Sequence, residues 1–338
     1  MFKNRKALFA GLPALIGMLP MPGGALFSAP LVESVDDENS LFSSEKAAIN
    51  YWFRHIWEYW WPMYPGVILA VKYSGLSFPK FMALQLPFTI ASLAGGYFFL
   101  LRNGKITDAI IKPSLQRGKG DVLSALGPIL LLVGTAIIGT SAFSRLVVSK
   151  TAASLLAMLA GLVLSIAIAL RGKRHAFVQS LSIFKRRNLW LMLILVVSVQ
   201  AFSNVLKCPL DTAENTMIAA MRTEFVRAGI PVVLIIMLMP FISGLATGLS
   251  FAFVGASFPI VFALIGNHPA AGEIAAVTTL AYSSGYLGMM FSPLHVCFVV
   301  TCEYYSTRMT RVYKYIAGPS LVILMMALFL AVLYSKLL

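Results

Sequence analysis

Four ionisable residues in otherwise apolar stretches could do chemistry. Arg54 and Glu58 lie four residues apart, so on a helix they share a face and can form an ion pair. His55 lies between them and can carry a proton near neutral pH, as can His295 in a second apolar stretch. Ionisable side chains at membrane depth usually line a cavity or a pathway. We therefore expect these four residues to form a charge or proton pathway.

Each of these residues also has a structural interpretation, and the sequence leaves both open. If the helix begins around Ala47, Arg54 and His55 would lie near the membrane interface, and Glu58 would only neutralise Arg54. His295 would be a buried histidine with satisfied hydrogen bonds. The aromatic residues around Arg54 would form an interfacial belt; they are Tyr51, Trp52, Trp57, Tyr59, Trp60 and Trp61.

Small residues gather where two uncharged stretches must reverse, at 20–24 and 243–250. Glycine lets a ligand approach the backbone closely, and a helix that starts after such a turn presents free N–H groups to an anion. Carbonyl and hydroxyl oxygens there are suited to Na⁺. Alternatively, the small residues only allow close helix packing. The expected substrate or ion ligands are Pro22, Gly23, Gly24, Ser28, Ser243, Gly244, Thr247, Gly248, Ser250 and Ser292.

An enzymatic role is the less favoured interpretation. His55 and Glu58 fit an H-x-x-E pattern that could hold zinc in an intramembrane hydrolase, but the third ligand would have to be His295 or Glu33. The cysteines show neither metal-ligand spacing nor a disulfide framework; they are Cys208, Cys297 and Cys302. We expect no catalytic residue, no metal ligand and no cofactor, with H⁺ or Na⁺ as the coupling ion.

These residues are set in a chain that is too apolar for a water-soluble protein. Of its 338 residues, 59% are hydrophobic and 12% charged, about half the charged fraction of soluble domains. The net charge is +14, but the basic residues lie in loops between apolar blocks, which is a topology signal and excludes nucleic acid as a partner. Because backbone in lipid must satisfy its own hydrogen bonds, we expect an all-α polytopic membrane protein surrounded by the lipid bilayer.

The apolar blocks predict an inverted repeat. Residues 7–32, broken by four prolines, and residues 228–267, too long for one span, each predict a re-entrant hairpin, although two short spans would also account for 228–267. Pro62 corresponds to Pro293 at an offset of 231 residues. The first half (1–121) contains the hairpin 7–32, the interrupted helix 47–71 and the span 81–101. The second half (122–338) contains the spans 122–144, 151–170 and 188–206, the hairpin 228–267, the interrupted helix 274–302 and the span 315–335.

The second half begins with three spans for which the first half has no counterpart. Either Met1 is not the true start, or the protein lacks half of its scaffold. The side with the N-terminus and 171–187 carries 18 basic residues against 8 on the other, so it should be cytoplasmic and the C-terminus outside. The first hairpin would then open to the cytoplasm and the second outward.

Three segments resemble the signature segments of a prokaryotic membrane family, the domain of unknown function 401 family. They read LPALIGMLPMPGGALFSAPLVE, INYWFRHIWEYWWPMYPG and GYLGMMFSPLHVCFVVTCEYY. That family is grouped with the ion-transporter superfamily. Ser292-Pro-Leu-His295 is similar to the Ser-Pro-x-His segment of some dicarboxylate and gluconate carriers, and Gly23-Gly-Ala-Leu26 resembles the hairpins of arsenite-type carriers. The resemblance implies elevator-type transport by a homodimer, and no particular substrate.

We therefore expect a secondary transporter of a small, anionic solute in a prokaryotic cytoplasmic membrane, coupled to H⁺ or Na⁺. The main alternative is a truncated or non-transporting membrane protein, and an intramembrane metalloenzyme is the less favoured third. Half-helix N-termini and Arg54 favour an anion, and the titratable residues favour proton coupling.

Overall fold

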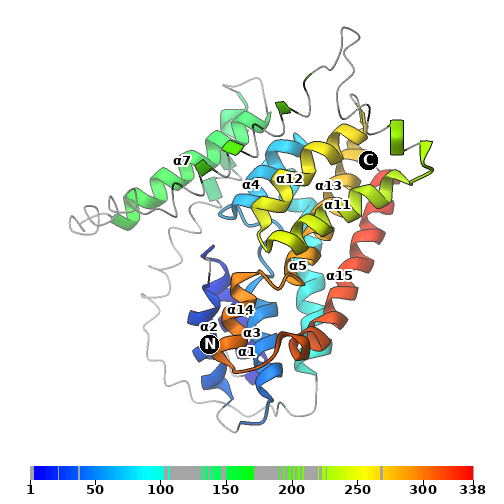
Figure 1. Ribbon diagram of the computed structural model, residues 1–338. Helices are drawn as coiled ribbons and strands as arrows, with labels where there is room; N and C mark the ends of the chain where they lie inside the picture. The colour runs from blue at the N-terminus through cyan, green and yellow to red at the C-terminus, as the bar shows by residue number, and fades with distance from the viewer. Residues whose placement is uncertain are drawn as a thin grey trace.

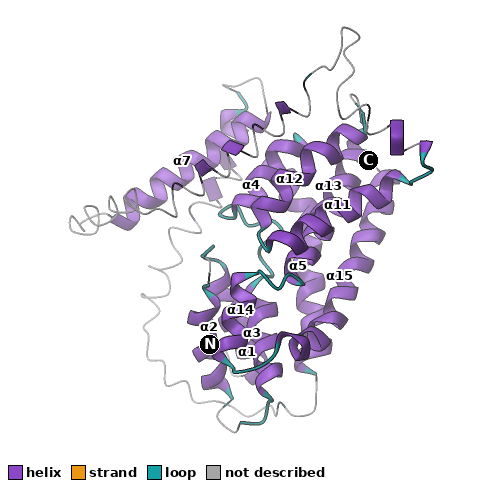
Figure 2. Ribbon diagram, in the orientation of Figure 1, coloured by secondary structure: helices purple, strands orange, loops and turns teal. Residues whose placement is uncertain are grey.

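The computed structural model describes residues 4–21, 23–36, 39–102, 150–170, 230–266 and 269–337, with short pieces between 106 and 229. Its regular elements within these residues are all helical (Figure 2). They are α1 (Arg5–Gly17), α2 (Ala25–Val35), α3 (Ser43–Arg54), α4 (Pro65–Ser74), α5 (Phe78–Gly96), η1 (Tyr97–Leu101), α7 (Lys150–Leu170), α11 (Val232–Thr247), α12 (Ser250–Leu264), α13 (Ala271–Met290), α14 (Val296–Tyr304) and α15 (Met309–Leu337). The all-α class is thus confirmed.

Two pairs of short helices are each joined by a tight connection. Helices α1 and α2 pack together and are linked by residues 18–24, where Gly23 has a φ of +71°. Helices α11 and α12 also pack together and are linked by Gly248, with a φ of +65°, and Leu249. Only glycine adopts a positive φ without steric cost. Both reversals therefore fall where the small residues gather in the sequence.

Two longer segments are interrupted in the middle. The first is α3 followed by α4, with residues 55–64 between them, and the second is α13 followed by α14, with residues 291–295 between them. We call these connections the first break and the second break. Figure 1 shows two helix bundles, and each contains one half of both interrupted segments. Helix α3 lies with α1, α2 and α14 in one bundle, and α13 lies with α11, α12 and α4 in the other. The two breaks consequently meet between the bundles.

Two long helices run alongside both bundles. Phe78–Leu101, which joins α5 to η1, and Met309–Lys336 in α15 are long and apolar enough to cross a membrane. They pack against each other along one side of the molecule (Figure 1). Large apolar side chains cover the outer faces of these helices and of α7 and are exposed, among them Ile90, Phe98, Leu159, Val163, Leu321, Met325 and Phe329. Such a surface supports a membrane protein.

Some of the predicted spans coincide with helices of the structure, and others lie outside the described residues. The span 81–101 lies within α5 and η1, 151–170 coincides with α7, and 315–335 lies within α15. The spans 122–144 and 188–206 fall largely outside the described residues.

A tyrosine hydroxyl donates to a backbone carbonyl in each break. The hydroxyl of Tyr286 donates to the carbonyl of His55 at 3.2 Å, and the hydroxyl of Tyr313 donates to the carbonyl of Phe291 at 2.9 Å. Non-helical backbone is tolerated at membrane depth only where protein or water satisfies it. The two tyrosines therefore reduce the free-energy cost of leaving these carbonyls outside a helix.

The aromatic residues of the first break direct polar atoms inward, to backbone carbonyls of the first helix pair. Four carbonyls at the end of a helix have no helical partner, and the break supplies donors to those of α1. Trp57 Nε1 donates to Ala14 O at 2.8 Å, Trp61 Nε1 to Met18 O at 3.0 Å, and the Tyr64 hydroxyl to Gly17 O. The aromatic cluster thus fixes the first helix pair to the first break.

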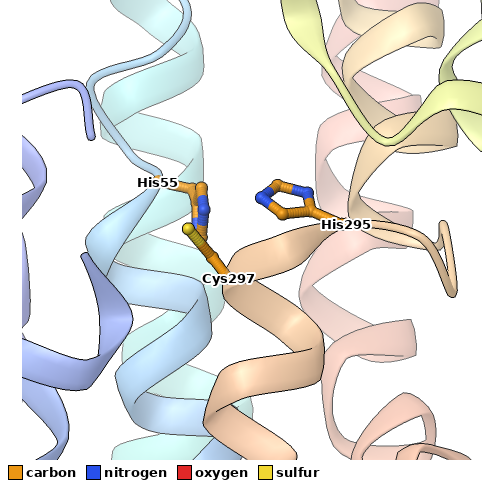
Figure 3. A group of neighbouring side chains, drawn as sticks. All are labelled: His55, His295 and Cys297. Carbon is orange, nitrogen blue, oxygen red and sulfur yellow. The ribbon is translucent and has the colours of Figure 1, made fainter. Parts of the chain in front are cut away.

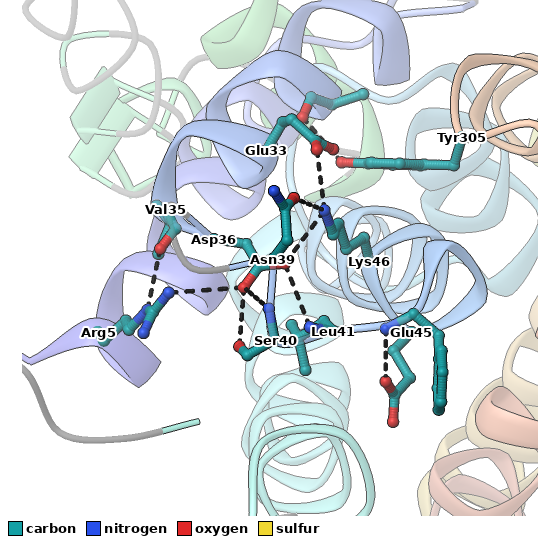
Figure 4. A network of polar contacts seen from close by, with 12 residues as sticks. Arg5, Glu33, Val35, Asp36, Asn39, Ser40, Leu41, Glu45, Lys46 and Tyr305 are labelled. Carbon is teal, nitrogen blue, oxygen red and sulfur yellow. Dashed lines mark hydrogen bonds and ion pairs between the residues drawn. The ribbon is translucent and has the colours of Figure 1, made fainter. Parts of the chain in front are cut away.

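An ion network, buried except for the partly exposed Glu33, lies at the other end of the first helix pair (Figure 4). Arg5 Nη2 lies 3.5 Å from Asp36 Oδ1, and Lys46 Nζ lies 3.1 Å from Asp36 Oδ2 and 2.8 Å from Glu33 Oε1. Burial opposes the charge on Asp36, but hydrogen bonds from Ser40 and Lys46 outweigh it and lower the pKa of Asp36. Burial likewise opposes the charge on Lys46, but its acidic partners outweigh it and raise the pKa of Lys46. Ion pairs between charged side chains therefore stabilise this end of the first helix pair.

Candidate functional site

A cavity of about 120 Å³ lies where the turns of both helix pairs meet both breaks. The first turn contributes Met21, the second turn contributes Gly248 and Ser250, and the breaks contribute Glu58 and His295. Arg54, the last residue of α3, also lines it. Segments far apart in the sequence thus build one site.

Three helix N-termini line this cavity: α4 at Pro65, α12 at Ser250 and α14 at Val296. Pro65 has no N–H, so α4 contributes the partial positive charge of its end, and the N–H donors come from α12 and α14. Among the described residues, no side chain caps any of the three. The first N–H groups of a helix have no helical acceptor, and the N-terminal end carries a partial positive charge. An anion in the cavity would satisfy both.

Arg54 adds a full positive charge. Its side chain is buried, and Nη2 donates to the carbonyl of Met21 at 3.1 Å. Its Nε has no hydrogen-bond partner among the described residues. Gly24 leaves the space that the guanidinium occupies, because a Cβ at Gly24 would overlap Nη2. The guanidinium is thus held at the first turn by a neutral carbonyl.

The predicted ion pair between Arg54 and Glu58 is absent from the described part of the structure. Helix α3 ends at Arg54, so the two residues do not share a helical face. Glu58 lies within the first break, with Oε1 3.8 Å from His55 Nε2. Arg54 and Glu58 nevertheless line the same cavity.

The two predicted histidines meet beside this cavity. The rings of His55 and His295 lie 4.9 Å apart, centroid to centroid, at 87°. Both side chains are buried. The first and second breaks therefore bring together residues that are 240 positions apart in the chain.

The small residues divide into two groups. Gly248 and Ser250 line the cavity. Pro22 lies outside the described residues. The predicted ligands that do not line the cavity are Gly23, Gly24, Ser28, Ser243, Gly244, Thr247 and Ser292.

Contacts within the helices explain this second group. Thr247 Oγ1 donates to the carbonyl of Ser243 at 2.7 Å, and Ser28 Oγ donates to the carbonyl of Ala25 at 3.3 Å. A Cβ at Gly244 would overlap the carbonyl of Gly285 in α13. These residues shape the turn and the packing, as the structural alternative expected.

Sequence reasoning missed Tyr64 and Cys297, which also line the cavity. Tyr64 precedes Pro65, and a proline at the start of a helix is a signal that could have placed the N-terminus of α4 there. Cys297 gives no such signal, because it follows His295 in an apolar run and its partner His55 comes from the other half of the chain.

Comparison with known proteins places the whole chain in one family. No match is found among curated proteins. A family model described as a protein of unknown function, DUF401, matches residues 2–335. The resemblance expected from the three signature segments is confirmed in this respect, and the chain belongs to the DUF401 family.

Proposed function

We propose that the protein is a secondary transporter of a small anionic solute in a prokaryotic cytoplasmic membrane. The main supporting observation is that Arg54 and three uncapped helix N-termini line the same cavity. A buried positive charge is costly unless negative groups balance it, and Glu58, which lines the same cavity, makes no direct ion pair with Arg54 in the described part of the structure. A bound carboxylate, phosphate or sulfate group would accept hydrogen bonds from the free N–H groups and offset the charge of Arg54.

The order of the helices supports transport over simple anion binding. A helix pair, an interrupted helix and a long helix occur in the order α1–α2, α3–α4, α5–η1 and again in the order α11–α12, α13–α14, α15. Inverted repeats with broken helices at a shared central site are the recurring plan of secondary transporters. In this proposal the first pair opens to the cytoplasm, the second opens outward, the C-terminus lies outside and the protein works as a homodimer.

Glu58 favours H⁺ over Na⁺ as the coupling ion. Its carboxyl group lines the cavity together with Arg54. An anion bound there is repelled by the carboxylate unless Glu58 takes up a proton. Anion and proton would therefore bind together and cross together.

Ligand-induced thermal stabilisation of the purified, detergent-solubilised protein tests anion binding. Small carboxylates, phosphate and sulfate would be screened with and without Na⁺ at several pH values. Arg54→Gln removes the charge at the cavity, and the control Arg311→Gln removes an exposed arginine from α15. We expect an anion to stabilise the wild-type and Arg311→Gln proteins, with the shift lost in Arg54→Gln. No shift with any anion in the wild type would refute the anion site.

Uptake by reconstituted vesicles then separates a transporter from a non-transporting membrane protein. A stabilising anion should accumulate inside vesicles when a pH gradient is imposed, and Arg54→Gln should abolish this. Binding without uptake would favour the non-transporting alternative.

A further inference from the structure

A compact group of three metal-ligating side chains lies beside the cavity (Figure 3). His55 follows α3, His295 precedes the first residue of α14, and Cys297 lies in the first turn of α14. One ligand atom from each residue lies within 4.8 Å of the other two. All three side chains are buried, with exposed fractions of 0%, 6% and 5%.

Backbone carbonyls orient both imidazole rings. His55 Nδ1 lies 2.6 Å from the carbonyl of Tyr51, and His295 Nδ1 lies 3.3 Å from the carbonyl of Met289. A carbonyl only accepts, so each Nδ1 is placed to donate, which leaves the Nε2 lone pairs free. Metal-ligating histidines commonly make this hydrogen bond with the nitrogen that does not bind the metal.

The freed atoms point toward one another. His55 Nε2 is buried and has no hydrogen-bond partner among the described residues. Figure 3 shows a ring nitrogen of His295 directed toward His55 and Cys297, and the sulfur of Cys297 close to the His55 ring. The Cys297 thiol offers His55 only a weak hydrogen bond, and a cation between the three residues would use the two imidazole lone pairs and the sulfur as ligands instead.

The ligand set and its charge suit zinc. Zn²⁺ takes imidazole nitrogens and thiolates as ligands and is usually tetrahedral. Its ligand atoms are about 3.3–3.7 Å apart, as follows from bonds of about 2.0–2.3 Å, so small side-chain rotations would close the site. The thiolate and the nearby carboxylate of Glu58, 3.8 Å from His55 Nε2, would balance the charge of the ion.

We propose that His55, His295 and Cys297 bind Zn²⁺ where the first and second breaks meet. The fourth coordination position would face the cavity, because His295 and Cys297 both line it. Three protein ligands with one open position are typical of zinc sites that bind a further ligand. The ion would tie the two halves of the chain together.

Cobalt substitution tests this site directly. Full-length protein, purified in detergent without a histidine tag and stripped with a chelator, would be titrated with Co²⁺ and then with Zn²⁺. We expect one equivalent of Co²⁺ to give thiolate-to-cobalt charge-transfer absorption and tetrahedral ligand-field bands, and Zn²⁺ to displace it. Folded wild-type protein that gives no thiolate band would overturn the proposal.

A matched pair of cysteine variants locates the site. Cys297→Ala removes the proposed ligand, whereas Cys302→Ala removes another buried thiol from the same helix. We expect Cys297→Ala to lose the band and to bind Zn²⁺ about 100-fold or more weakly, since outer partners alone are worth about 10- to 100-fold. Cys302→Ala should behave like the wild type.

The histidines provide a second measurement if Cys297→Ala does not fold. His55→Gln and His295→Gln should each weaken Zn²⁺ binding while the sulfur remains. A band that survives in folded Cys297→Ala, or Zn²⁺ affinity unchanged in both histidine variants, would assign the metal to other groups and refute the site. These readouts do not depend on solute transport, so they stand or fall separately from the proposed function.

Discussion

Tyr51 and Tyr282 make reciprocal hydrogen bonds across the junction of the two breaks. The hydroxyl of Tyr51 in α3 donates to the carbonyl of Met290 at the end of α13, at 3.0 Å. The hydroxyl of Tyr282 in α13 donates to the carbonyl of Glu58, just beyond the end of α3, at 2.7 Å. The two tyrosines are 231 residues apart, the same offset as between Pro62 and Pro293.

These hydrogen bonds predict that both tyrosines stabilise the fold. Tyr51→Phe and Tyr282→Phe each leave one buried carbonyl without its donor, and Tyr51→Phe also removes the contact between the hydroxyl and His295 Nδ1, 3.3 Å away. We expect each to lower the free energy of unfolding by about 1 kcal/mol, measured by denaturant unfolding in detergent. A loss confined to one of the two would contradict this expectation.

Substitutions at two glycines next to Arg54 should distinguish an effect on stability from an effect on anion binding. A Cβ at Gly17 would overlap the backbone carbonyl of Arg54, whereas a Cβ at Gly24 would meet the end of the Arg54 side chain. Gly17→Ala should therefore cost about 1–3 kcal/mol of stability.

Gly24→Ala should instead leave the fold intact and displace the guanidinium from the cavity. Losing one charge-assisted interaction of about 1.5–3 kcal/mol corresponds to at least about tenfold weaker anion binding. Thermal unfolding and anion titration of both variants check this pair. Unchanged anion affinity in Gly24→Ala would show that Arg54 does not hold the anion.

The ion network at Asp36 predicts a stability that depends on pH. Because the folded pKa of Asp36 is lowered from 3.8, its contribution is present above that pH and is lost as the pH falls through the folded pKa. Because the folded pKa of Lys46 is raised from 10.5, its contribution is present below that pH and is lost as the pH rises through the folded pKa. The network should be strongest between these limits.

Asp36→Asn tests this network, because it removes the carboxylate charge that Arg5 and Lys46 share, while Lys46 keeps Glu33 and Arg5 keeps the carbonyl of Val35. We expect a loss of about 3 kcal/mol at pH 7, and a smaller difference from the wild type in unfolding measurements near pH 3. The control Glu224→Gln breaks an exposed ion pair with Arg227 and should change stability by less than about 1 kcal/mol. A constant difference across this pH range would assign the effect of Asp36→Asn to its shape and not its charge.

How far the sequence could predict this structure depends on whether the signal was local. Proline and glycine act on their own neighbours, so the turn at Gly248 and the interruption near Pro293 could be located from composition and spacing. The contacts of Tyr51 with Met290 and of His55 with Cys297 could not, because they join halves of the chain that only the fold brings together. The expected Arg54–Glu58 pair failed for the same reason: it assumed a continuous helix through a segment that tertiary contacts hold open.

The membrane placement of the first helix pair is the prediction on which the proposed transport cycle most depends. If α1 and α2 form a re-entrant hairpin, Asn4 and Ser34 lie on the same side of the membrane, and Lys72 at the end of α4 lies on the other side with Lys336. All four are exposed. Single cysteines at these positions, with the exposed Cys208 replaced by serine, would be labelled in intact cells with a membrane-impermeant thiol reagent. We expect Lys72→Cys and Lys336→Cys to react from outside, and Asn4→Cys and Ser34→Cys to react only after the membrane is permeabilised. Opposite labelling of positions 4 and 34 would mean that the first pair crosses the membrane, and the alternating openings of the two helix pairs would then be lost.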